Sequence, residues 1–142
     1  MARNTVQALN PSPTLALMAK VQALRAQGED IISFAAGEPD LDTPEPVKEA
    51  AIKAIREGFT KYTPSAGIPE LREAVAQKLF RENGISVQPD QVVISCGAKH
   101  AVFNALLAVC SPGDEVAILT PAWPTYREQV ILAGAKPVFI PT

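Results

Sequence analysis

Apolar residues recur at intervals of three and four positions in five segments of this 142-residue chain. Residues with this spacing lie on one face of an α-helix, and the turns between the segments contain glycine and proline. The pattern predicts helices at 13–27, 44–57, 69–83, 98–110 and 126–132. Ser12 and Thr43 are expected to cap the first two helices, and Asn83-Gly84 to end the third.

Short runs of apolar and β-branched residues predict strands at 31–34, 91–95, 115–120 and 136–140. From residue 91 onward, strands and helices alternate, which is typical of a mostly parallel sheet with helical crossovers. Ligands of such sheets bind at the carboxyl ends of the strands. The loops at 95–99 and 120–125 are therefore the places to look for a site.

Length and composition indicate an ordinary globular domain, with 47% hydrophobic and 20% charged residues. A net charge of −2 gives no reason to expect a nucleic acid or an anionic membrane as partner. No apolar run approaches the ~20 residues that span a bilayer, and the amino terminus lacks the pattern of a signal peptide. We expect a cytoplasmic protein without a metal site, in which Cys96 and Cys110 are buried, unpaired thiols.

The segment at 95–100, Ser-Cys-Gly-Ala-Lys-His, carries the clearest candidate chemistry. It joins the predicted strand at 91–95 to a helix, whose first N–H groups have no partner within the helix and favour an anion. Gly97 and Ala98 allow a ligand close to the backbone, and Lys99 adds a positive charge. A lysine is unfavourable beside a helix N-terminus, which argues for a functional role.

Trp123 is the only tryptophan of the chain and stands in a proline-rich loop at the carboxyl end of a predicted strand. An aromatic ring in that position is better placed to contact a ligand than to fill a core.

Four segments in this order resemble class I aminotransferases, which are pyridoxal-phosphate enzymes, and most closely the bacterial aspartate aminotransferases of the Ib type. They are Ala-Gly-Glu-Pro-Asp at 36–40, Lys-Tyr-Thr at 61–63 with Gly-Ile-Pro-Glu-Leu-Arg at 67–72, Ser-Cys-Gly-Ala-Lys at 95–99, and Pro-Ala-Trp-Pro-Thr-Tyr at 121–126. The resemblance covers the chain from about residue 6 to residue 142. It implies an α/β fold, namely an amino-terminal helical arm (1–45) and the first part of the large, cofactor-binding domain (46–142), with a mostly parallel sheet flanked by helices.

The resemblance also implies a cofactor site. Gly97, Ala98 and Lys99 match the loop that receives the phosphate of pyridoxal phosphate, and Trp123 matches the residue stacked on its ring. Tyr62 matches a tyrosine that crosses the interface of a homodimer to the partner's cofactor phosphate.

The substrate side of the implied site involves further residues. Gly37 matches the glycine against the substrate α-carboxylate. Lys99 also matches a lysine that faces the side-chain carboxylate of a dicarboxylic substrate, with Trp123 beside it. Ser12 and Thr14 resemble the hydroxyl residues near that carboxylate, although helix capping alone also explains Ser12. His100 matches no family role.

The implied function is amino transfer from L-aspartate to 2-oxoglutarate, with an amino acid and a 2-oxo acid as small-molecule partners. The family's cofactor-binding lysine and its other catalytic groups have no match here, so this chain is expected to be a truncated, inactive piece with no catalytic residue of its own. Another class I aminotransferase, of aromatic, kynurenine or alanine type, is one alternative. A non-catalytic fragment that binds only the cofactor or a partner chain is another.

One residue departs from the pattern of family members that also act on prephenate. Those members resemble one another in having a lysine before the Pro-Ser of the first helix, whereas Asn10 stands there in this chain. We therefore do not expect prephenate activity.

Overall fold

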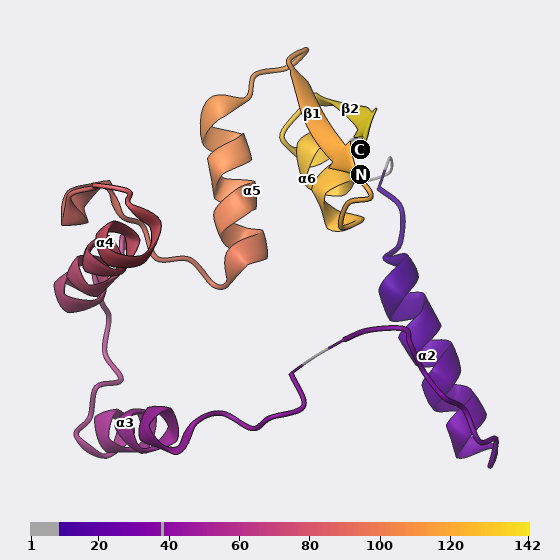
Figure 1. Ribbon diagram of the computed structural model, residues 1–142, viewed down its shortest axis with the longest axis horizontal. Helices are drawn as coiled ribbons and strands as arrows, with labels where there is room; N and C mark the ends of the chain where they lie inside the picture. Colours follow the sequence, from indigo (N-terminus) through magenta and orange to yellow (C-terminus); the bar gives the residue numbers. More distant parts are fainter. Residues whose placement is uncertain (1–8, 38) are drawn as a thin grey trace. The chain divides into compact units, whose positions relative to one another are not determined.

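The computed structural model describes residues 9–37 and 39–142 (Figure 1). Glu38, within the Ala-Gly-Glu-Pro-Asp segment, lies outside the described residues. The helices are α2 (Pro13–Ala26), α3 (Glu45–Arg56), α4 (Pro69–Asn83), α5 (Ala98–Val109) and α6 (Thr125–Leu132), with a short 3₁₀ helix η1 (Pro89–Gln91). The strands are β1 (Glu115–Thr120) and β2 (Lys136–Pro141). All five predicted helices are therefore present.

Local signals explain where two of the helices begin or end. The Ser12 hydroxyl accepts a hydrogen bond from the Leu15 backbone N–H at 3.4 Å, which caps α2 as expected. Gly84 adopts a left-handed conformation with φ of 67° directly after α4, as a C-cap glycine does.

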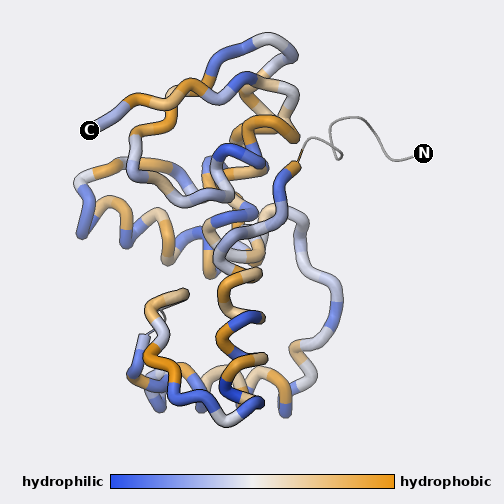
Figure 2. Tube along the Cα trace, turned by 90° about the vertical axis from the view of Figure 1, so that its right-hand side faces the viewer, coloured by the Kyte–Doolittle hydropathy of each residue, from blue (hydrophilic) through white to orange (hydrophobic). Residues whose placement is uncertain are grey.

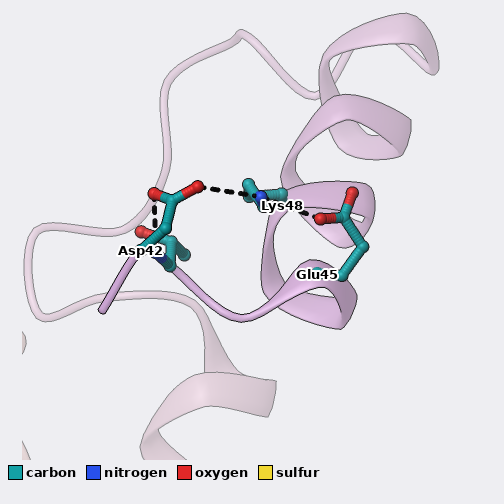
Figure 3. Close-up of polar contacts among 4 residues, drawn as sticks. Asp42, Glu45 and Lys48 are labelled. Atoms are coloured by element: carbon teal, nitrogen blue, oxygen red, sulfur yellow. Dashed lines mark hydrogen bonds and ion pairs between the residues drawn. The ribbon is translucent and has the colours of Figure 1, made fainter.

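The predicted cap of α3 is wrong. Thr43 does not cap it, because the extended backbone of Pro44 (φ −55°, ψ 139°) makes Pro44 itself the N-cap residue and starts the helix one position later than predicted. The helix begins at Glu45, and no side chain caps it. Instead, Lys48 forms ion pairs with Glu45 at 2.8 Å and with Asp42 at 3.1 Å, which connect the first turn to the preceding loop (Figure 3).

The described part of the chain divides into two compact units, one formed by residues 9–37 and 97–142 and the other by residues 39–96. In the first unit, β1 and β2 pair in parallel, from Glu115 opposite Lys136 to Thr120 opposite Pro141. Ile118, Val130 and Ala135 form its small buried core, with α6 packed against the strand pair. This unit carries the predicted ligand loop at 120–125 and residues 97–99 of the other predicted loop.

The second unit has its own packing around α4. Ala76 and Val92 are buried, and the Arg72 side chain donates a hydrogen bond to the Val92 carbonyl at 3.0 Å. The Ile94 N–H donates to the Ala66 carbonyl at 2.9 Å, which holds the segment after η1 against the loop before α4.

Two of the four predicted strands are not strands in the described part of the chain. Residues 31–34 and 91–95 pair with no neighbouring strand there, and a strand is defined by such pairing. Val92 is nevertheless extended, with φ of −105° and ψ of 129°. The predicted alternation of strands and helices from residue 91 is thus confirmed only from α5 onward.

The prediction for the cysteines is half right. Neither forms a disulfide in the described structure, but Cys96 is exposed and Cys110 is only partly buried. Cys96 lies in the loop before α5 rather than inside a paired strand. The proposed boundary between an arm (1–45) and a large domain (46–142) stays a prediction. Within the described residues, no helix has the length and apolar character needed to cross a membrane.

Candidate functional site

The loop between β1 and α6 places Trp123 at the carboxyl end of β1. The residue is 45% exposed, so it is accessible to a ligand. The Tyr126 N–H donates a hydrogen bond to the Trp123 carbonyl at 3.1 Å, which ties this loop to the first turn of α6. The backbone that carries the indole is therefore bonded to a regular helix.

A residue in the first turn of α5 lies over the Trp123 ring. Gly97 occupies the N-cap position with φ of 85°, no side chain caps the helix, and a Cβ on Gly97 would meet nothing within 4 Å. The Lys99 ammonium lies 5.1 Å from the centroid of the Trp123 ring, a distance at which a cation is attracted to the aromatic face. Lys99 and Trp123, predicted separately from the sequence, thus form one pair.

A hollow of about 430 Å³ adjoins Trp123 and is shared with the segment before α2. Its wall combines Asn10, Pro11, Ser12 and Pro13 with residues of the strands, the loop and α6: Ile118, Thr120, Ala122, Trp123, Pro124, Thr125, Arg127, Glu128 and Phe139. Ser12 and Trp123, 111 positions apart, therefore line the same space.

Glu128 joins the two sides of this hollow. Its carboxylate accepts a hydrogen bond from the Asn10 N–H at 3.3 Å and forms an ion pair with Arg127 at 2.5 Å. Sequence reasoning missed both residues, since an acidic residue in the first turn of a helix is common and needs no special role.

Gln129 forms a second link from α6. Its side chain is buried, with 6% exposure, and its amide nitrogen donates a hydrogen bond to the Lys99 carbonyl at 2.7 Å. Its other amide atom, Oε1, is buried without a hydrogen-bond partner among the described residues. A glutamine between Glu128 and Val130 carries no sequence signal for this role.

The remaining predicted residues are not in the wall of the hollow, and no contact described for them reaches the Lys99–Trp123 pair. Thr14 lies in the first turn of α2 and is half-buried, but it is not in the wall of the hollow. Gly37 is exposed, and no contact described for it reaches Trp123 or Lys99. Tyr62 belongs to the second unit, where its side chain is fully exposed. His100 is exposed and keeps no assigned role.

The groups brought together fit a particular kind of ligand. An uncapped helix N-terminus and an ammonium favour a phosphate or carboxylate, and a half-exposed indole favours a flat ring. The open space at Gly97 leaves room for such a group beside the backbone. The donor set therefore suits a phosphorylated aromatic cofactor such as pyridoxal phosphate.

These features define an α/β protein with a candidate anion site at the carboxyl end of a parallel strand. The family model described as "Aminotransferase class I and II" matches residues 29–142, and the chain belongs to this family. The aspartate/prephenate aminotransferase of Thermus thermophilus is 53% identical over 137 residues, and the aspartate aminotransferase of Bacillus subtilis is 47% identical over 135 residues. These matches cover 96% and 95% of this chain.

A solved structure agrees with this assignment. The aspartate aminotransferase of Thermus thermophilus with maleate superposes on all of the chain with a TM-score of 0.96 and 51% sequence identity. The chain spans about a third of the length of these relatives, 36% and 34% of the two sequences and 37% of the solved chain. The predicted fold, part of a fold-type I transferase, is confirmed, and aspartate aminotransferases of this family depend on pyridoxal phosphate.

Proposed function

We propose that this chain forms part of a pyridoxal-phosphate-dependent aspartate aminotransferase and contributes cofactor- and substrate-binding residues to it. Such an enzyme moves the amino group of L-aspartate to 2-oxoglutarate. The observation that carries the proposal is the Lys99 ammonium 5.1 Å from the Trp123 ring centroid, beside the uncapped start of α5. The aspartate aminotransferases among the relatives support it.

The cofactor would be held by residues from two adjacent elements. Backbone N–H groups of Gly97, Ala98 and Lys99 would receive its phosphate, and Trp123 would stack on its ring. When bound, the cofactor supplies an electron-withdrawing ring that makes the α-hydrogen of the amino acid acidic. The chain's own residues bind and orient the reactants.

The substrate's two carboxylates would have different partners. The Lys99 ammonium would attract the side-chain carboxylate of aspartate, with the Ser12 and Thr14 hydroxyls nearby as further donors. The backbone at Gly37 would lie against the α-carboxylate, where a side chain would block close approach. Neutral amino acids also have the α-carboxylate, so recognition of the side-chain carboxylate is what separates aspartate from them.

We also propose a homodimer in which Tyr62 reaches the partner's cofactor phosphate. The complete exposure of the Tyr62 side chain supports this role, because a large aromatic residue with no cover is suited to an interface.

The decisive experiment replaces Lys99 by Ala in the complete protein. Loss of a charge-assisted contact of about 1.5–3 kcal/mol should lower kcat/KM for aspartate about 10–150-fold, and that for alanine or phenylalanine much less. Lys53→Ala is the matched control, since the Lys53 side chain is exposed on α3 and pairs only with Glu57 at 3.8 Å among the described residues. Steady-state kinetics with the three amino acids would measure the change.

The outcome also separates the alternatives within the family. A wild-type enzyme that strongly prefers aromatic or small neutral amino acids would contradict the aspartate proposal and favour an aromatic, kynurenine or alanine aminotransferase. A complete protein that binds pyridoxal phosphate in equilibrium dialysis without any turnover would favour a non-catalytic binding role.

Prephenate is a second candidate substrate, because the Thermus thermophilus relative is named an aspartate/prephenate aminotransferase. The wall of the hollow contains the neutral Asn10 at the position where a lysine is expected for that activity. We therefore propose that aspartate is accepted and prephenate is poorly used. Comparable kcat/KM values for prephenate and aspartate would contradict this.

A further inference from the structure

Gln129 is a buried polar residue that the packing of α6 does not require. It neighbours Val130, the most deeply buried apolar side chain described, and its own side chain is 6% exposed. A buried amide oxygen without a partner is unfavourable, and Gln129 Oε1 is such an atom. A leucine or methionine would fill this place without that penalty.

What the glutamine adds is one directed hydrogen bond. Its Nε2 donates to the Lys99 carbonyl at 2.7 Å, across 30 positions of sequence. A carbonyl oxygen can only accept, so the amide nitrogen must face it and the amide oxygen is left unpaired. The bond fixes the first turn of α5 to α6.

This bond sets the geometry of the Lys99–Trp123 pair. Trp123 enters the site from the amino-terminal end of α6, where the Tyr126 N–H holds its carbonyl. Lys99 enters from the start of α5, and Gln129, one turn further along α6, holds the Lys99 backbone. The backbones of both members of the pair are thereby bonded to the same helix, and in this arrangement the Lys99 ammonium lies 5.1 Å from the ring centroid.

We propose that Gln129 is a positioning residue for substrate specificity. It acts through Lys99 and orients the ammonium for a second carboxylate on the substrate. The inference rests on the proposed function and deepens it, since it assigns the preference for dicarboxylic substrates to a residue that touches neither substrate nor cofactor.

The test uses the complete protein loaded with pyridoxal phosphate and the variant Gln129→Met. The ratio of kcat/KM for aspartate to kcat/KM for alanine should fall about three- to tenfold. In calorimetric titrations, the affinity for maleate should fall by a similar factor, while that for the monocarboxylate butyrate should not change. The midpoint of thermal unfolding should stay the same or rise, because the unpaired oxygen is removed.

Val130→Ala is the matched control for a purely structural effect. It removes buried volume from the same helix but leaves the Gln129–Lys99 bond. It should therefore lower the unfolding midpoint and leave unchanged both the aspartate-to-alanine ratio of kcat/KM and the affinity for maleate relative to butyrate. A fall of the substrate ratio in Val130→Ala as large as in Gln129→Met would overturn the inference.

A double variant distinguishes this inference from the proposed function. In a Lys99→Ala background, Gln129→Met should cause no further fall in the aspartate ratio, because its effect passes through Lys99. If Lys99→Ala lowers the ratio and Gln129→Met does not, the inference fails and the proposed function stands. If Lys99→Ala itself leaves the ratio unchanged, both fail.

Discussion

Single residues divide into those that the sequence could place and those that it could not. Lys99 and Trp123 were predictable because each stands where the sequence pattern predicts a strand–helix junction, and ligand sites of α/β proteins occur there. Glu128 and Gln129 were not, because their partners lie 118 and 30 positions away and no local pattern marks them. Contacts at such separation depend on the folded chain, and the wall shared by Ser12 and Trp123 is another example.

Gly67 gives a prediction at this scale. It has φ of +102°, and a Cβ there would lie 2.4 Å from the Ile94 side chain. Gly67→Ala in the complete protein should therefore lower the free energy of unfolding by about 2–5 kcal/mol, from backbone strain and overpacking together. Denaturant unfolding monitored by circular dichroism would measure it.

Gly58→Ala is the control for Gly67→Ala. Gly58 also has a positive φ, +78°, but a Cβ there would meet nothing within 4 Å. Backbone strain alone should cost about 1–2 kcal/mol at this position. Equal losses in the two variants would show that the contact with Ile94 is unimportant.

At the scale of elements, the helices were predictable and half of the strands were not. Figure 2 shows apolar and polar residues alternating along the helices, and this periodicity with its caps is local information. A strand also requires a neighbour, so 31–34 and 91–95 have strand-like sequences without forming strands in the described structure. Thr43 failed as a cap because the backbone of Pro44 is extended, whereas Pro13 after Ser12 is already the first residue of its helix.

The start of α3 gives a prediction about pH. Glu45, and to a smaller extent Asp42, raise the pKa of Lys48 above its ordinary value of 10.5 (Figure 3). The stabilisation from a raised lysine pKa is fully present below the unfolded value and is lost as pH rises through the folded value. NMR titration of the Lys48 side chain should give a midpoint above 10.5.

Two variants test the cause of this shift. Glu45→Gln should lower the Lys48 midpoint more than Asp42→Asn does, because the Glu45 hydrogen bond is the larger contribution. A midpoint that neither variant changes would mean that the ion pairs are absent in solution.

For the whole molecule, exposed apolar surface is the dominant feature. Large apolar side chains with high exposure include Ile32, Phe34, Leu41 and Phe80. A second hollow of about 510 Å³ is lined mainly by apolar residues of α5, of β1 and of the loop that follows β1. In the described part of the chain, β1 pairs only with β2. Such surfaces and open edges favour association with further protein.

We therefore expect the isolated 142-residue polypeptide to be poorly soluble or partly molten unless a partner covers it. Its thermal unfolding should be broad, and it should bind a dye that reports exposed apolar surface. The complete protein should unfold more sharply and bind less dye. Calorimetry of the isolated polypeptide decides, since a single sharp two-state transition of a monomer would contradict this expectation.

The pairing of β1 with β2 has a consequence in time. Every residue pair of the register is 21 positions apart, and the intervening α6 supplies Val130 to the same core. Contacts at short separation close quickly, because little chain entropy is lost in forming them. The bond from Asn10 to Glu128 spans 118 positions, and closing it loses more chain entropy. In refolding from the unfolded chain, we therefore expect the strand pair to form first and the segment before α2 to reach its place on α6 afterwards.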